Sequence, residues 1–186
     1  MSSVHVLEKV IDSKDFTVGG GSAAALAGAM AAGMVAMVAR LSTKKDYGLS
    51  AEKYMEIAEE GDHLAKDLLL GAEKDTQAFC MIKDAYALPK ATDEEKKQRS
   101  QAIQNGAIQA ATVPMQNGQM CKRVQELSLL LDGQSNPNAG SDLAEAILLA
   151  GAGVKGCVLN IEANLPLIKN EKVKADFQKQ IEILSK

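Results

Sequence analysis

The chain carries the run VGGGSAAALAGAMAAGMVAMVAR at residues 18–40, its most distinctive stretch. After the three glycines, the run consists mainly of Ala, Met and Leu, which favour helix. We therefore expect a long helix from Ala23 to near Ser42. Because nearly all of its side chains are small, neighbouring helices can approach it closely. The run predicts a central helix that other helices surround.

Three consecutive glycines, Gly19, Gly20 and Gly21, precede this helix. Glycine allows backbone angles and close approaches that side chains forbid. A helix N-terminus adds unpaired N–H groups and the positive end of the helix dipole, so the segment suits an anionic or polar ligand. We expect Ser22 to cap the helix. A plain linker is the alternative. The run is neither a Walker loop nor a dinucleotide fingerprint, because no Lys follows the last glycine and no strand-like run precedes the first.

The composition is that of a soluble globular protein. A length of 186 residues predicts one domain, residues 1–186, with a sizeable core. Hydrophobic residues make up 46% and charged residues 24%, which is ordinary for this class. Aromatic residues are only 3%, so Ala, Leu, Ile, Val and Met must build the core. The net charge of −3 and the lack of a basic stripe with aromatics argue against nucleic acid as a partner.

The cysteines and histidines give no sign of a disulfide framework or a metal site. The three cysteines are odd in number and scattered, which predicts a reducing, cytoplasmic location. His5 and His63 have no Cys or His neighbour at ligand spacing, so we expect no bound metal.

One segment raises the question of a membrane. Residues 23–39 carry no charge and approach the length of a membrane span. They are short, and rich in Ala and Gly rather than Leu, so a buried helix of a soluble bundle is the favoured interpretation. Residues 1–14 lack the apolar core of a signal peptide.

No segment alternates with a period of two residues, so we expect an all-α fold: an up-and-down bundle of five or six helices. Ser50 is an expected N-cap, Thr92 and Glu95 form an expected capping box, and Pro114 is expected to kink its helix. The expected helices span residues 4–11, 23–42, 50–87, 92–131, 139–164 and 169–185.

The third of these helices has an inward-facing stripe with one polar member, Asp75. A carboxylate on a buried face is costly unless it is paired or functional. The structural alternative is an ion pair with a lysine such as Lys83 or Lys90. The stripe, with steps of three and four residues, comprises Tyr54, Ala58, Gly61, Ala65, Leu68, Ala72, Asp75, Phe79, Ile82 and Tyr86.

The fifth helix has a second small, apolar stripe with polar ends: Asp142, Ala146, Leu149, Gly153, Gly156 and Asn160. Asp142 has a structural alternative as a first-turn acid favoured by the helix dipole, and Asn160 has one as a bridge between helices. Together with Asp75 and the glycine segment, these residues predict one shared polar pocket. Ser22 is a weak candidate nucleophile because no His can be placed beside it.

Several of these blocks resemble the C-terminal domain of the formiminotransferase-cyclodeaminase family. Residues 18–26, VGGGSAAAL, and 37–42, MVARLS, are similar to its glycine-rich signature. Further matching blocks follow in order: DTQAF at 75–79, LPKATDEEK at 88–96, ATVP at 111–114 and NAGSD at 138–142. Because no transferase half accompanies them, the resemblance implies a stand-alone cyclodeaminase or the related methenyltetrahydrofolate cyclohydrolase.

Two positions depart from the family pattern. Val18 replaces the Pro that usually precedes the glycines. In the family's Asn-Val-x-x-Asn segment, Asn160 is kept but Gly156 stands where the first Asn is expected. The second departure removes one expected pocket contact.

The resemblance implies a one-carbon-substituted tetrahydrofolate as the substrate, no permanently bound cofactor, and a homodimer. Its first implied activity is cyclodeaminase: N10 attacks the formimino carbon on N5, ammonia leaves, and the 5,10-methenyl ring closes. Asp75 aligns with the catalytic Asp and would manage protons. The expected substrate-binding residues are Gly19, Gly20, Gly21, Ser22, Lys90, Asn138, Ser141, Asp142 and Asn160. A lysine or a helix N-terminus would suit the anionic glutamate tail.

Two alternatives stand beside the cyclodeaminase. The methenyltetrahydrofolate cyclohydrolase opens the same ring with water, and the residues do not separate the two reactions. A non-catalytic helical interaction module is the alternative of another class; it predicts no folate binding and tolerance of Asp75→Asn.

Overall fold

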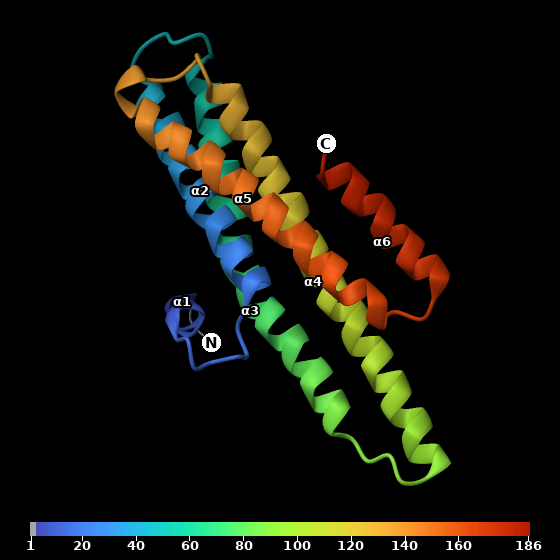
Figure 1. The fold of residues 1–186 in the computed structure, drawn as a ribbon. Coiled ribbons are helices and arrows are strands. Elements are labelled where there is room, and N and C mark those ends of the chain that lie inside the picture. Colours follow the sequence, from blue (N-terminus) through green and yellow to red (C-terminus); the bar gives the residue numbers. More distant parts are fainter. Residues whose placement is uncertain (1–2) are drawn as a thin grey trace.

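The computed structural model describes residues 3–186, and these residues form helices and no strands. The helices are α1 (Ser3–Ile11), α2 (Gly20–Ser42), α3 (Ala51–Ala87), α4 (Asp93–Leu131), α5 (Gly140–Asn164) and α6 (Glu171–Leu184), with short 3-10 turns η1 (Pro137–Ala139) and η2 (Leu165–Leu167). Figure 1 shows α2–α5 as a bundle, with α1 and α6 as short helices on its outside. The expected all-α class is confirmed.

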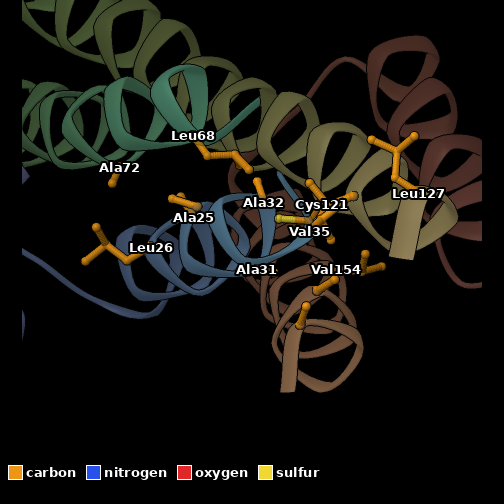
Figure 2. Packing of buried hydrophobic residues seen from close by; sticks show 14 of the residues in the cluster. Ala25, Leu26, Ala31, Ala32, Val35, Leu68, Ala72, Cys121, Leu127 and Val154 are labelled. Carbon is orange, nitrogen blue, oxygen red and sulfur yellow. The ribbon is translucent and has the colours of Figure 1, made fainter. Parts of the chain in front are cut away.

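Helix α2 lies at the centre of the bundle, in contact with α3, α4 and α5. Its side chains are small enough for the surrounding helices to come close (Figure 2). A Cβ at Gly28 would overlap Cys121 Sγ of α4, so this crossing requires glycine. The predicted central helix is therefore confirmed, and its packing explains how a core with few aromatic residues is built.

Most expected helix boundaries agree with the structure to within two residues. Ser50 caps α3 by accepting a hydrogen bond from Lys53 N–H, and Thr92 and Glu95 form the full capping box of α4. The start of α2 differs. The helix begins at Gly20, three residues earlier than expected, with Gly19 as its N-cap.

Hydrogen bonds hold together the end of the bundle at which α2 ends and α5 begins. At the C-terminal end of α2, Ser42 Oγ accepts from Asn136 N–H at 2.9 Å, and the Tyr54 hydroxyl donates to Gln134 O at 2.6 Å. These bonds tie the loop before α5 to α2 and α3. Helix α5 thus starts beside the end of α2 and runs antiparallel to it, which brings the end of α5 to the first turn of α2.

Beyond Asp75, the expected inward stripe of α3 is only partly right: Ile82 packs against Ala78, Ala110 and Val113, but Phe79 and Tyr86 do not lie inside. Phe79 is 45% exposed and Tyr86 is 47% exposed, although both were expected inside. Beyond Thr76, the buried positions in this half of the helix are Ala78 and Ala85, which face a different direction. The reason is that α2 begins at Gly20 and does not cover this part of α3, so α4 is the main helix packed against it (Figure 1). The segment of residues 12–17 also lies beside Phe79 and Lys83.

Candidate active site

Five of the expected site residues meet where α2 begins, at a cluster that we call the polar junction: Gly20, Gly21, Ser22, Asp75 and Asn160. Ser22 Oγ lies 2.9 Å from Asp75 Oδ2, to which it donates a hydrogen bond. The same hydroxyl is 3.0 Å from Ala72 O. It is also 3.3 Å from the hydroxyl of Thr76, a buried neighbour that the sequence patterns did not single out. Helices α2 and α3 therefore join through polar groups at this point of an otherwise apolar seam.

Gly21 allows the Asp75 carboxylate to lie directly against the first turn of α2. A Cβ at Gly21 would overlap both carboxylate oxygens, so no other residue fits without moving Asp75. The carboxylate thereby sits at the positive end of the α2 dipole. Two features noted separately in the sequence, the glycines and Asp75, are parts of one arrangement.

Ser22 does not cap α2, contrary to expectation. It lies within the helix, and the N-cap Gly19 has no side chain to offer. The hydroxyl of Ser22 is instead directed to Asp75. Because the first N–H groups of a helix have no partner inside it, those of Gly20 and Gly21 are available to a ligand.

Burial raises the pKa of Asp75 above its ordinary value of 3.8, while hydrogen bonds from the hydroxyl and the backbone N–H of Ser22 hold it down. Among residues 3–186, no cation lies within ion-pair distance of Asp75. The alternative of an ion pair with Lys83 or Lys90 is therefore wrong; both lysines are exposed. Asp75 is therefore a carboxyl group that is shielded from solvent and has no ion-pair partner in the described part of the chain, and hydrogen bonds from Ser22 tune its pKa.

Asn160 brings α5 to the junction. Its Nδ2 donates to Gly156 O at 2.8 Å, and a Cβ at Gly20 would lie 3.2 Å from this nitrogen. The departure from the family pattern at Gly156 has a packing reason, since a Cβ there would lie 2.7 Å from the Cβ of Ala24. The glycine lets α5 lie close against α2.

Pro114 helps to hold the end of α5 in place. Proline has no N–H, so the carbonyl of Ala110, four residues earlier, loses its helical partner. Asn164 Nδ2 supplies the missing donor at 3.1 Å and also donates to Asn160 O at 2.8 Å. The proline of α4 thus creates the acceptor that anchors Asn164 beside the polar junction. Sequence patterns gave no sign of this role for Asn164.

The remaining expected site residues lie elsewhere. Asn138, Ser141 and Asp142 are at the start of α5, and Asp142 is separated from Asn160 by 18 residues of one helix, which is about 27 Å. A single chain therefore does not bring Asp142 and Asn160 into one pocket, so the prediction of a shared pocket is wrong for these two residues. Binding roles for the three residues at the start of α5 stay predictions.

Lys90 is exposed and lines a cavity of about 510 Å³ beyond the end of α3. It shares this cavity with Lys96, Arg99 and Lys169, which the sequence patterns do not single out.

In the part of the chain that is described, no three His, Cys, Asp or Glu side chains gather as a metal site would require.

Comparison with known proteins identifies the family. A family model described as formiminotransferase-cyclodeaminase matches residues 3–183. The chain belongs to this family. A methenyltetrahydrofolate cyclohydrolase from Methylorubrum extorquens is 34% identical over 98% of the chain and 89% of its own length. The formimidoyltransferase-cyclodeaminase of Gallus gallus is 28% identical over 93% of the chain, which spans 32% of that protein.

The solved structures include a relative with the same fold. The crystal structure of formiminotetrahydrofolate cyclodeaminase from Thermotoga maritima matches all of this chain with a TM-score of 0.84 and 27% sequence identity. The match covers 88% of the Thermotoga chain. Family membership confirms that the chain is an enzyme of the cyclodeaminase or cyclohydrolase kind. The alternative of a non-catalytic interaction module is set aside.

Proposed function

We propose that this enzyme acts on the one-carbon bridge of 5,10-methenyltetrahydrofolate and opens it with water to give 10-formyltetrahydrofolate. The observation that carries the proposal is Asp75, a carboxyl group with a raised pKa held against the first turn of α2. The relative that is 34% identical along nearly the whole chain bears the cyclohydrolase name, which supports the hydrolytic direction. No cofactor is required for this chemistry.

The reaction needs a group that moves protons. Water attacks the bridging carbon, and Asp75 accepts a proton from it as the new C–O bond forms. The C–N5 bond then breaks, N5 is protonated, and the formyl group stays on N10; one proton is released overall. The substrate's bridge is cationic, so a carboxylate beside it also favours binding. The Gly20 and Gly21 N–H groups and Asn160 are the nearest donors for the pterin ring and its carbonyl.

A cyclodeaminase is the second candidate, because the matching solved structure bears that name. In that reaction N10 attacks the formimino carbon on N5, ammonia leaves, and the methenyl bridge closes. The proton lost by N10 and the proton gained by the departing nitrogen can both pass through Asp75. The same residues therefore serve both reactions.

The deciding experiment is to incubate the purified protein with 5,10-methenyl- and 5-formimino-tetrahydrofolate in turn. We expect rapid loss of the methenyl absorbance from the first substrate above the spontaneous rate. Ammonia release and methenyl formation from the second substrate alone would assign the cyclodeaminase instead. Turnover of neither would refute both candidates.

Changing Ser22 to Ala is expected to move the acid limb of the pH–rate profile to higher pH. The hydroxyl of Ser22 lowers the pKa of Asp75 against the effect of burial, so its loss raises that pKa further. The base is then protonated at a higher pH, and the rate falls earlier as the solution is acidified. Thr112→Ala, which removes a hydroxyl within α4, is the control and should leave the limb in place. A shift of the Ser22→Ala limb to lower pH would contradict the assignment of Asp75 as the base.

We also propose that the enzyme is a homodimer. The apolar surface that a dimer would cover belongs to two stretches, α2 and Pro137–Leu167. By length and composition alone, each is long and apolar enough to cross a membrane. The most apolar window of α2 is 67% buried within the bundle, but that of the second stretch only 39%. An exposed apolar face runs over these neighbouring helices, formed by Met30, Met37, Leu41, Leu148 and Leu159. A second copy of the chain would cover it.

Sedimentation velocity at micromolar concentration should show a dimer. Leu148, 68% exposed, is the most exposed member of this face. Leu148→Lys should therefore shift the protein towards monomer, because a charge would be buried at the interface. Ile183→Lys places the same charge on an exposed apolar position of α6 and should leave the dimer intact. A wild-type protein that sediments only as a monomer would refute the dimer.

A further inference from the structure

Two exposed phenylalanines, Phe16 and Phe79, border one cavity, and we call them the aromatic pair. The cavity has a volume of about 570 Å³. Phe16 is 83% exposed and comes from the segment between α1 and α2, whereas Phe79 comes from α3. Phe177, the third phenylalanine of the chain, is buried. In a protein so poor in aromatic residues, two exposed rings at one cavity indicate a binding surface.

Phe79 lies next to Asp75 on the same face of α3. It follows Asp75 by four residues, which is about one helical turn and a rise of about 6 Å. Because side chains on a helix lean towards its N-terminus, the ring of Phe79 is inclined towards Asp75. Figure 1 shows α3 continuing beyond the first turn of α2, so α2 does not cover this ring. Phe79 therefore borders the place where Asp75 would meet a substrate.

Phe16 is presented by an ordered turn close to the polar junction. Its neighbour Asp15 accepts hydrogen bonds from the N–H of Thr17, at 2.8 Å, and from the Thr17 hydroxyl. Asp15 also lies 3.8 Å from the ammonium group of Lys9 in α1. A backbone ordered in this way loses less entropy when a ligand binds. Phe16 precedes Gly20 by four residues, so even an extended chain keeps it within about 14 Å of the polar junction.

The charges around this cavity favour neither anions nor cations by themselves. Two acids, Asp12 and Asp15, and two lysines, Lys14 and Lys83, line it. The faces of aromatic rings carry partial negative charge and attract cations. The bridge of 5,10-methenyltetrahydrofolate is a flat cation whose charge is shared between N5 and N10. It is the part of the proposed substrate that such rings would recognise.

We propose that Phe16 and Phe79 bind the cationic bridge of 5,10-methenyltetrahydrofolate and make the enzyme prefer this charged form to neutral folates. The inference rests on the proposed function, which puts the bridging carbon at Asp75. With the bridge there, the ring of Phe79 lies beside it, and Phe16 closes the same cavity. Opening the bridge removes the positive charge, so the aromatic pair holds the 10-formyl product less tightly than the substrate. The pair thus favours release of the product.

The test compares Kd values for two folates that differ chiefly in charge. The bridge of 5,10-methenyltetrahydrofolate is cationic, and that of 5,10-methylenetetrahydrofolate is neutral. Both are titrated by calorimetry into the Asp75→Asn enzyme, in which no carboxylate at position 75 contributes to the preference for a cation. We expect the methenyl form to bind about tenfold more tightly. Adding Phe16→Leu and Phe79→Leu should reduce this ratio to about twofold, because leucine keeps an apolar contact but has no aromatic face.

The matched control adds Phe16→Tyr and Phe79→Tyr to the same Asp75→Asn enzyme. It keeps both rings and should keep the tenfold ratio. An unchanged ratio in the leucine variant would overturn the proposal. Equal weakening of both folates would also overturn it, because the pair would then be only an apolar surface. A leucine variant that sediments differently from its parent would assign the rings to a subunit interface instead.

The binding measurement is independent of turnover, so it separates this proposal from the proposed function. A ratio that falls only in the leucine variant supports the aromatic pair even if the wild-type enzyme turns over neither 5,10-methenyl- nor 5-formimino-tetrahydrofolate. Conversely, if wild type hydrolyses the methenyl form but the Asp75→Asn enzyme binds both probes equally, the proposed function stands and the aromatic pair is refuted.

Discussion

Replacing Asp75 with Asn is expected to lower kcat at least about 100-fold, the usual scale for a lost acid–base group. The amide has nearly the same shape and can still accept hydrogen bonds from Ser22, so the polar junction should keep its geometry. Only the group that titrates is lost. The measurement is steady-state turnover of 5,10-methenyltetrahydrofolate, with folate binding measured on the same preparation.

Asp75→Asn is also expected not to lower the stability of the folded protein. Because burial raises the pKa of Asp75, ionising it costs folding free energy, and this cost develops as pH rises from the ordinary value of 3.8 through the raised one. At neutral pH, Asp75→Asn removes the cost, so Tm should be no lower than that of wild type. Asp84→Asn, at an exposed position of α3, is the matched control and should keep full activity. Near-normal turnover of Asp75→Asn would falsify the catalytic role.

Gly21→Ala is expected to produce the second largest loss of activity, at least about tenfold in kcat, because catalysis is sensitive to shifts of about 1 Å. The new methyl group would overlap the Asp75 carboxylate and displace it from the first turn of α2. Helix content should be kept, since Ala favours helix over Gly by about 1 kcal/mol. Steady-state kinetics and circular dichroism measure both expectations.

Gly33→Ala is the control for this change. Gly33 lies on the same helix, and nothing lies within 4 Å of the position its Cβ would take. It gains the same helix propensity without touching the polar junction. Because Gly33 shares the helix face of Met30 and Met37, sedimentation velocity first checks that the variant is still a dimer, and its activity should then match wild type. If both alanine variants retain full activity, the close approach of Gly21 to Asp75 has no catalytic importance.

The helices could be predicted from the sequence because their signals are local. The apolar periodicity and the capping box at Thr92 and Glu95 set helix positions that the structure confirms. The start of α2 could not be predicted in the same way. Glycine disfavours helix by propensity, yet Gly20 and Gly21 are helical here because Asp75 and Asn160 pack against them. Tertiary contacts override the local preference.

The site was predicted only in part, for a geometric reason. Asp75 stood out because it broke an apolar stripe, and the structure places it beside the glycines. Stripe positions define the face of a helix, but not which part of that face other helices cover. Phe79 and Tyr86 are therefore exposed although they share the face of Asp75, and Asp142 lies one helix length from Asn160. No sequence pattern points to Asn164 or Arg99, because each donates a hydrogen bond to a backbone carbonyl of another helix.

The central claim is that the one-carbon bridge of the folate lies against Asp75, and a crystal structure of the inactive Asp75→Asn enzyme with 5,10-methenyltetrahydrofolate tests it most directly. The account predicts the bridging carbon within reach of the amide at position 75, directly or through one water, with the pterin at the first turn of α2. A folate bound elsewhere, such as in the separate cavity between α3 and α4 lined by Leu64, Gly71, Asn117 and Arg123, would contradict it.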